Sequence, residues 1–194
     1  MDSSNNTLLT LMQAAKPVIR IDGLKSGLWR RRMGENPNDF RLGPWRAADW
    51  SILDKNVYFA VGEVLYLLAD GAGRVRYVGE SKGRLRTRWR TPPLADLANG
   101  EKGSQIFHNI AWPKIEAMLA ADPQAGPFQV SVIGVNKLNE LVSLHSDLRS
   151  AVEAASREHG RKHLSWHVET WLCQQPGLQA HLWNVAKRGR GALR

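Results

Sequence analysis

Two tyrosines and a dense run of basic residues stand close together in the sequence and could act jointly on a phosphate ester. Tyr66 and Tyr77 are eleven positions apart, and residues 74–90 contain seven Lys or Arg against one Glu. An isolated tyrosine, with a pKa of about 10, is a poor base at neutral pH, but nearby cations favour its phenolate form. We therefore predict Tyr66 as a general base and Tyr77 as a group that orients water or phosphate. For either tyrosine alone, cross-strand packing is the alternative interpretation.

A glutamate and an arginine would supply the charge that phosphodiester hydrolysis needs. A divalent ion held by Glu169 would polarise a phosphate oxygen and neutralise the leaving oxygen. A lone carboxylate completed by waters suits Mg²⁺, or Mn²⁺ in its place. Arg88 offers a planar, permanently charged fork to the same phosphate. Taken singly, Arg88 is also interpretable as a solvated charge and Glu169 as a surface residue.

A β-hairpin is predicted to position the two tyrosines. Residues Val57–Ala69 are rich in β-branched and aromatic side chains, and Arg74–Gly79 alternates between polar and apolar. The turn Asp70-Gly71-Ala72-Gly73 joins them with glycines that tolerate positive φ. The basic residues 84–90 then begin a helix, which Pro92-Pro93 ends.

The rest of the chain is predicted to add helices and a third strand. A helix over Ala111–Ala121 has Pro113 in its first turn, and Phe128–Val135 is a strand. A long helix follows, capped by Asn136 and ended by Gly160; a last helix covers Ser165–Gln175. The predicted fold is α+β, a small three-stranded, mostly antiparallel sheet flanked by helices.

The ordered motifs resemble the GIY-YIG nuclease family, which is named for a tripeptide on each of its first two strands. Here the tripeptides are Val64-Leu65-Tyr66 and Tyr77-Val78-Gly79, and Leu85-Arg86-Thr87-Arg88-Trp89 matches the family's arginine helix. The family also has a metal-binding glutamate and a later asparagine, which correspond to Glu169 and Asn184. The resemblance spans residues 58–186 and implies that Tyr66, Tyr77, Arg88, Glu169 and Asn184 are catalytic.

The chain departs from the family pattern at three places. The first tripeptide reads Val-Leu-Tyr, with Val64 and Leu65 in the place of Gly-Ile. The family's His or Tyr one turn after the arginine is Pro92 here, and His108 is the nearest candidate to replace it. Glu80 stands where the excision-repair branch has a lysine.

Residues 1–57 are predicted to form a basic, loop-rich, Trp-rich N-terminal extension. Trp29, Trp45 and Trp50 alternate with arginines in this segment. Such interleaving is typical of nucleic-acid surfaces, although the tryptophans are also interpretable as plugs that hold the extension onto the core. The residues predicted to bind nucleic acid are Lys82, Arg84, Arg86, Arg90, Arg30, Arg31 and Arg32, and a basic tail, 187–194, adds to them.

The whole composition favours a polyanionic partner. The chain of 194 residues has a formal charge of +9 and a pI near 10.1, as expected for nucleic-acid binding. A single cysteine excludes a disulfide framework, and we predict a cytoplasmic protein without membrane contact. The predicted function is metal-dependent cleavage of double-stranded DNA by a restriction-type enzyme, which could act as a homodimer. The alternatives are a homing or repair nuclease domain that needs a targeting partner and a catalytically silent nucleic-acid-binding relative.

Overall fold

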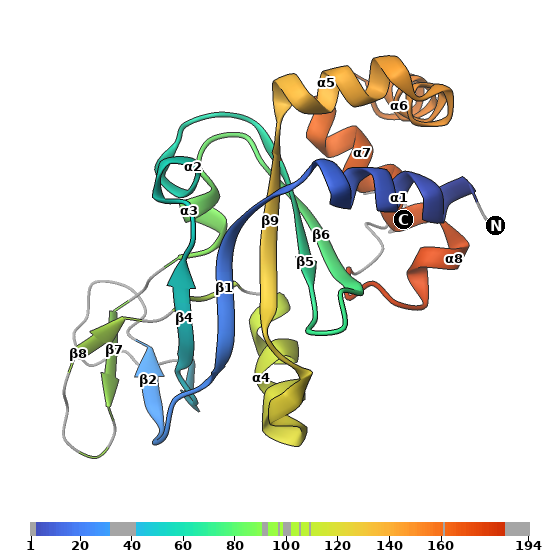
Figure 1. Ribbon diagram of the computed structural model, residues 1–194. Helices are drawn as coiled ribbons and strands as arrows, with labels where there is room; N and C mark the ends of the chain where they lie inside the picture. The colour runs from blue at the N-terminus through green and yellow to red at the C-terminus, as the bar shows by residue number, and fades with distance from the viewer. Residues whose placement is uncertain are drawn as a thin grey trace, which may run out of the picture.

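A computed structural model describes residues 3–31, 42–90, 93–96, 98, 102–104, 106–108, 110–160 and 162–184. Its centre is a five-stranded antiparallel sheet in the order β4-β1-β9-β5-β6, flanked by helices (Figure 1). The α+β class is therefore confirmed. No helix in the described part of the chain is both long and apolar enough to cross a membrane.

The predicted hairpin and third strand form one side of this sheet. Strand β5 covers Val64–Ala69, and β6 covers Val75–Ser81. The third strand, β9 (Phe128–Gly134), pairs with the other edge of β5. Strand β6 forms the edge of the sheet, so side chains near its end remain accessible to groups from neighbouring helices.

The prediction of three strands is wrong because two more come from the N-terminal segment. Strand β1 (Lys16–Leu24) pairs with β9, and β4 (Ala48–Ile52) pairs with β1. Val18, Ile19 and Ile21 of β1 are fully buried. The glycines, prolines and arginines that follow β1 indicated a loop-rich segment. The short apolar run of β1 forms a strand because it pairs with β9, which is more than 100 residues away in the sequence.

A second, four-stranded sheet has the order β3-β2-β7-β8. It consists of β2 (Trp29–Arg31), β3 (Leu42–Trp45), β7 (Pro93–Asp96) and β8 (Lys102–Ser104). Trp29 and Trp50 pack against the main hydrophobic core. For these two tryptophans the structure therefore favours the interpretation as core plugs.

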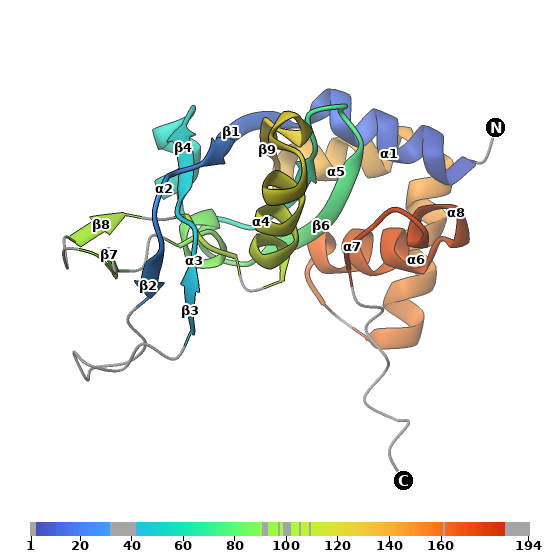
Figure 2. The ribbon, with the colours of Figure 1, turned by 90° about the horizontal axis from the view of Figure 1, so that it is seen from below.

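Helices cover both faces of the main sheet (Figure 2). On one face, α2 (Lys55–Phe59), α3 (Leu85–Arg88) and α4 (Ala111–Ala121) share a core that includes Tyr66, Trp89 and Trp112. The 3₁₀ turn Pro123–Ala125 follows α4 and has no buried residue. On the other face lie α1, α5, α6, α7 and α8. Their bounds are Ser3–Ala14, Val135–Leu144, Ser146–His159, Leu164–Gln174 and Pro176–Gln179.

The alternation along β5 decides which residues face which core. Leu65 and Leu67 belong to the cluster beneath α5–α7, whereas Tyr66 and Leu68 belong to the cluster beneath α3 and α4. Because both faces are covered, β5 is apolar throughout. Tyr66 therefore lies in a core, in the same cluster as Trp89 and Trp112.

Two helix predictions need correction. The single helix predicted from Asn136 to Gly160 is two helices, α5 and α6, because His145 between them has an extended backbone. The leucine spacing continues across this break and cannot reveal it. The helix predicted over residues 84–90 is shortened to the single turn of α3, whereas α4 matches its prediction and α7 begins and ends within one residue of its own.

Candidate active site

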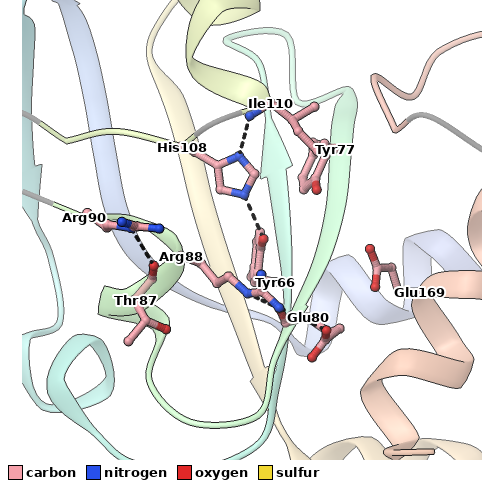
Figure 3. A pocket seen from close by; sticks show the side chains of 9 residues that line it. All are labelled: Tyr66, Tyr77, Glu80, Thr87, Arg88, Arg90, His108, Ile110 and Glu169. Carbon is pink, nitrogen blue, oxygen red and sulfur yellow. Dashed lines mark hydrogen bonds and ion pairs between the residues drawn. The ribbon is translucent and has the colours of Figure 1, made fainter. Parts of the chain in front are cut away.

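A cavity of about 250 Å³ opens at the edge of the main sheet and gathers most of the predicted catalytic residues (Figure 3). Its walls include five of the six, from five separate parts of the chain: β5, β6, α3, the segment before α4, and α7. The full lining is Tyr66, Tyr77, Glu80, Thr87, Arg88, Arg90, His108, Ile110 and Glu169. Asn184, the sixth predicted residue, is not among the described residues that line it.

The two tyrosines lie side by side on the floor of the cavity. The centroids of the Tyr66 and Tyr77 rings are 6.2 Å apart, with the planes inclined by 23°. Tyr66 pairs with Gly79 across the hairpin. A Cβ on Gly79 would collide with the ring of Tyr66, so a glycine at this position leaves the space that the ring occupies.

His108 fixes the hydroxyl of Tyr66 from the other side. Its Nδ1 accepts the backbone N–H groups of Ile110 (3.3 Å) and Ala111 (3.2 Å) at the start of α4. Its Nε2 lies 2.9 Å from the Tyr66 oxygen. Because Nδ1 is an acceptor, the ring proton of neutral His108 is on Nε2 and is donated to Tyr66. Burial, with the Arg88 charge, lowers the pKa of His108 to about 4, so the ring is neutral at neutral pH.

The prediction that nearby cations lower the pKa of Tyr66 is wrong. Burial raises this pKa well above its ordinary value, and the negative charges of Glu169 and Glu80 raise it further, while Arg88 lowers it. Burial, again with Glu169, raises the pKa of Tyr77 to about 12. The main reason is burial of the Tyr66 ring, and several of the basic side chains are exposed or bond elsewhere. Lys82, Arg84 and Arg86 are exposed, and Arg74 and Arg76 pair with Asp70.

Arg88 reaches the cavity from α3 and is held there by Glu80. Its Nε donates to the backbone oxygen of Glu80 (3.0 Å), and Nη2 lies 3.2 Å from Oε1 of the same residue. A guanidinium has five N–H donors. Two bonds to Glu80 therefore leave donors for an anionic ligand in the cavity.

Glu169 arrives from α7, around the edge strand β6. It is only 4% exposed, and its charge acts on both tyrosines. The N-terminus of α7 is capped by Glu63, whose Oε1 accepts the backbone N–H of Ser165 at 2.6 Å. Because Glu63 immediately precedes β5, this contact ties the helix of Glu169 to the strand of Tyr66. Among the described residues, no three of His, Cys, Asp and Glu form a metal-binding group.

Asn184 bonds to the backbone of the edge strand. Its Nδ2 donates to the oxygen of Val78 (2.6 Å), and its Oδ1 accepts the N–H of the same residue (3.0 Å). The backbone N–H of Trp183 donates to Arg76 oxygen (2.6 Å). The side chain of Asn184 thus pairs with the backbone of β6 at Val78, as a neighbouring strand would, next to Tyr77.

The predicted nucleic-acid-binding residues fall into two groups. Lys82, Arg84, Arg86 and Arg90 are exposed on and beside α3, near the cavity. The guanidinium of Arg86 lies 5.4 Å from the ring centroid of Phe59, and Arg90 Nε donates to Thr87 oxygen. Arg30 and Arg31 belong to β2, but their side chains lie outside the described part of the structure, as do Arg32 and the tail 187–194.

Two glutamates at the site were missed as functional candidates. The sequence analysis named Glu80 only as a departure from a family pattern and did not name Glu63. The available signal was position: Glu63 immediately precedes the strand of Tyr66, and Glu80 lies three residues after Tyr77 on the same strand. That signal is weak, because the partners of both residues, Arg88 and Ser165, become neighbours only in the folded chain.

Comparisons with known proteins give no match at three levels. No protein-family model, no curated protein and no solved structure matches this chain. The function is therefore inferred from the geometry and charge of the site.

Proposed function

We propose that this protein is a divalent-metal-dependent endonuclease that hydrolyses DNA phosphodiester bonds with a GIY-YIG-like site. The observation that carries the proposal is that five predicted catalytic residues meet at one cavity. Tyr66, Tyr77, Arg88, His108 and Glu169 come from five parts of the chain and line one cavity. A purely structural role for each residue gives no reason for the five to share a solvent-accessible hollow.

The side chains can divide the chemistry of phosphodiester hydrolysis between them. Arg88 binds a non-bridging phosphate oxygen through its remaining donors. Tyr66 first loses its hydroxyl proton to solvent through the cavity. As the phenolate it then takes a proton from the attacking water, and the Nε2–H of His108 stabilises that phenolate. Tyr77, beside Tyr66, orients the water or the phosphate.

The residues at the site fit a hard divalent cation. Carboxylate oxygens are ligands that Mg²⁺ prefers, and Glu169 presents one in the cavity. Its negative charge disfavours both phenolates, and a cation beside it would reverse that effect. When bound, Mg²⁺ or Mn²⁺ supplies Lewis-acid stabilisation of the phosphate and of the leaving oxygen.

Double-stranded DNA is the proposed substrate because basic side chains surround the cavity. Exposed Lys82, Arg84, Arg86 and Arg90 lie on or beside the helix of Arg88, where they can contact the phosphates that flank the reacting one. We favour a restriction-type enzyme. One site per chain then cuts both strands as a homodimer or by sequential nicking.

Two observations favour a second function, that of a catalytically silent DNA-binding relative. The pKa of Tyr66 is raised, and Glu80 pairs with Arg88 in the protein without ligand. If Tyr66 kept its proton and Arg88 stayed bound to Glu80, the protein would bind DNA without cutting it.

The deciding experiment is digestion of a plasmid with and without Mg²⁺. The proteins are wild type, Glu169→Gln, Tyr66→Phe and, as a matched control, Glu140→Gln, which changes an exposed glutamate on α5. We expect metal-dependent, discrete fragments from wild type and control and none from the two site variants. Indiscriminate cutting would instead favour a domain that needs a targeting partner. Binding without cutting would support the silent relative, and cleavage by Glu169→Gln would refute this site.

A further inference from the structure

Glu80 has a half-satisfied carboxylate inside the cavity. Its side chain is 10% exposed, and Oε1 pairs with Arg88 at 3.2 Å. Its other oxygen, Oε2, is buried and has no hydrogen-bond partner among the described residues. A buried carboxylate oxygen without a partner is costly, so this atom points to a group that binds there.

The surroundings indicate that the group is a cation. Glu80 and Glu169 line the same cavity, with Tyr66 (Figure 3). Both carboxylates raise the pKa of Tyr66, which places both within electrostatic reach of its hydroxyl. Arg88 engages only Oε1 of Glu80, so Oε2 is left for a positively charged group, and Glu169 adds a second carboxylate to the same cavity.

We propose that Glu80 is a second carboxylate ligand of the divalent cation site that Glu169 forms, with one oxygen on Arg88 and the other on the cation. This inference rests on the metal dependence proposed above. Mg²⁺ is commonly held by one or two carboxylates and waters, so two glutamates are sufficient. In this arrangement a single side chain positions both the arginine and the cation that bind the phosphate.

Binding of Mn²⁺ to the DNA-free protein tests the proposal without reference to cleavage. The affinity would be measured by isothermal titration calorimetry, with free Mn²⁺ checked by electron paramagnetic resonance, for wild type, Glu80→Gln, Glu169→Gln and the control Glu140→Gln. We expect each of the two cavity variants to bind at least about tenfold more weakly, and the control to bind like wild type.

Thermal unfolding separates a metal ligand from a residue that only holds Arg88. The ion pair with Arg88 involves a half-exposed arginine and contributes little by itself. If Oε2 is a ligand atom, Glu80→Gln removes a buried carboxylate whose second oxygen has no partner without metal, so the melting temperature of the metal-free variant equals or exceeds that of wild type. The rise that Mn²⁺ produces in wild type should then be lost in the variant.

The outcomes distinguish this proposal from the proposed function. Wild-type affinity in Glu80→Gln with loss in Glu169→Gln would overturn the role of Glu80 and leave the nuclease intact. No Mn²⁺ binding by wild-type protein would also overturn it, whatever the plasmid assay shows. The expected pattern of Mn²⁺ binding in a protein that cuts no DNA would support the cation site and refute the nuclease.

Discussion

At the scale of single residues, the site depends on a histidine whose protonation is set by backbone groups. Two N–H groups at the start of α4 bond to Nδ1 of His108 and leave Nε2 as a donor to Tyr66. A neutral donor is useful beside a catalytic tyrosine, since it stabilises the phenolate without adding a permanent buried charge. In the structure His108 lies against the Tyr66 hydroxyl, and its predicted role as the replacement for Pro92 stays a prediction.

The neutral state of His108 predicts how stability depends on pH. Its pKa is about 4 in the folded protein and about 6.5 in an unfolded chain. Between these values the unfolded chain binds more protons, so the free energy of unfolding falls as the pH is lowered. From pH 7 to 4.5 we expect wild type to lose about 2–3 kcal/mol more than His108→Gln. Urea denaturation at both pH values measures this difference, and equal losses would show that His108 is not held neutral.

At the level of secondary-structure elements, the N-terminus of helix α7 is capped by a side chain from outside the helix. The N-cap residue His163 makes no side-chain capping bond. Glu63, at the start of the hairpin, accepts the Ser165 N–H instead and lies 3.5 Å from His163 Nδ1. A carboxylate at a helix N-terminus also complements the helix dipole. The placement of Glu169 relative to Tyr66 thus depends on this contact.

Removal of the Glu63 cap should lower both stability and activity. We expect Glu63→Ala to reduce the free energy of unfolding by about 1–2 kcal/mol. Because Glu169 would shift with its helix, the cleavage rate should fall by up to about 10²-fold. Glu140→Ala is the control, an exposed glutamate on another helix. Denaturation and plasmid cleavage provide the two readouts, and an unchanged cleavage rate would argue against positioning by Glu63.

The close approach of the hairpin strands makes a second prediction at this scale. In Gly79→Ala the new Cβ would meet the ring of Tyr66, and overpacking of this kind costs about 1–3 kcal/mol. Displacement of the Tyr66 hydroxyl from His108 should reduce cleavage by about 10²-fold. Gly83→Ala is a matched control, because its Cβ has open space around it. A fully active Gly79→Ala enzyme would contradict the proposed role of Tyr66.

At the scale of the whole molecule, charge is distributed unevenly around the site. The formal charge is +9, while the cavity contains Glu80 and Glu169 among its lining residues. Arg88 and Arg90 line the same cavity, and further exposed basic side chains lie on and beside α3. This arrangement would allow a basic surface to hold the proposed DNA backbone while the two carboxylates bind the proposed metal.

The salt dependence of DNA binding tests this distribution. Each phosphate contact contributes about 0.9 to the slope of log affinity against log salt. The double variant Arg84→Ala/Arg86→Ala should therefore lower the slope by about 2, roughly equally for different sequences. Fluorescence anisotropy with a short duplex in the absence of Mg²⁺ measures it, with Lys137→Ala on α5 as control. Slopes that match in all three proteins would place the DNA elsewhere.

Much of the local structure could be predicted because it depends on neighbouring residues. The hairpin around Asp70–Gly73, helix α4 and helix α7 follow from turn residues and apolar spacing. The break at His145 could not be predicted, since the apolar spacing continues through it. Strands β1 and β4 were missed for a different reason: their partners are distant in the sequence.

Sequence patterns are sufficient to predict the α+β class, the order of the hairpin and major helices, and the residue types available for phosphate chemistry. How those residues act on one another depends on the folded chain. Folding buried Tyr66 and raised its pKa, turned Asn184 onto the backbone of Val78, and paired Glu80 with Arg88. Burial and pairing depend on contacts between segments that are far apart in the chain, so local patterns of residue type do not contain them.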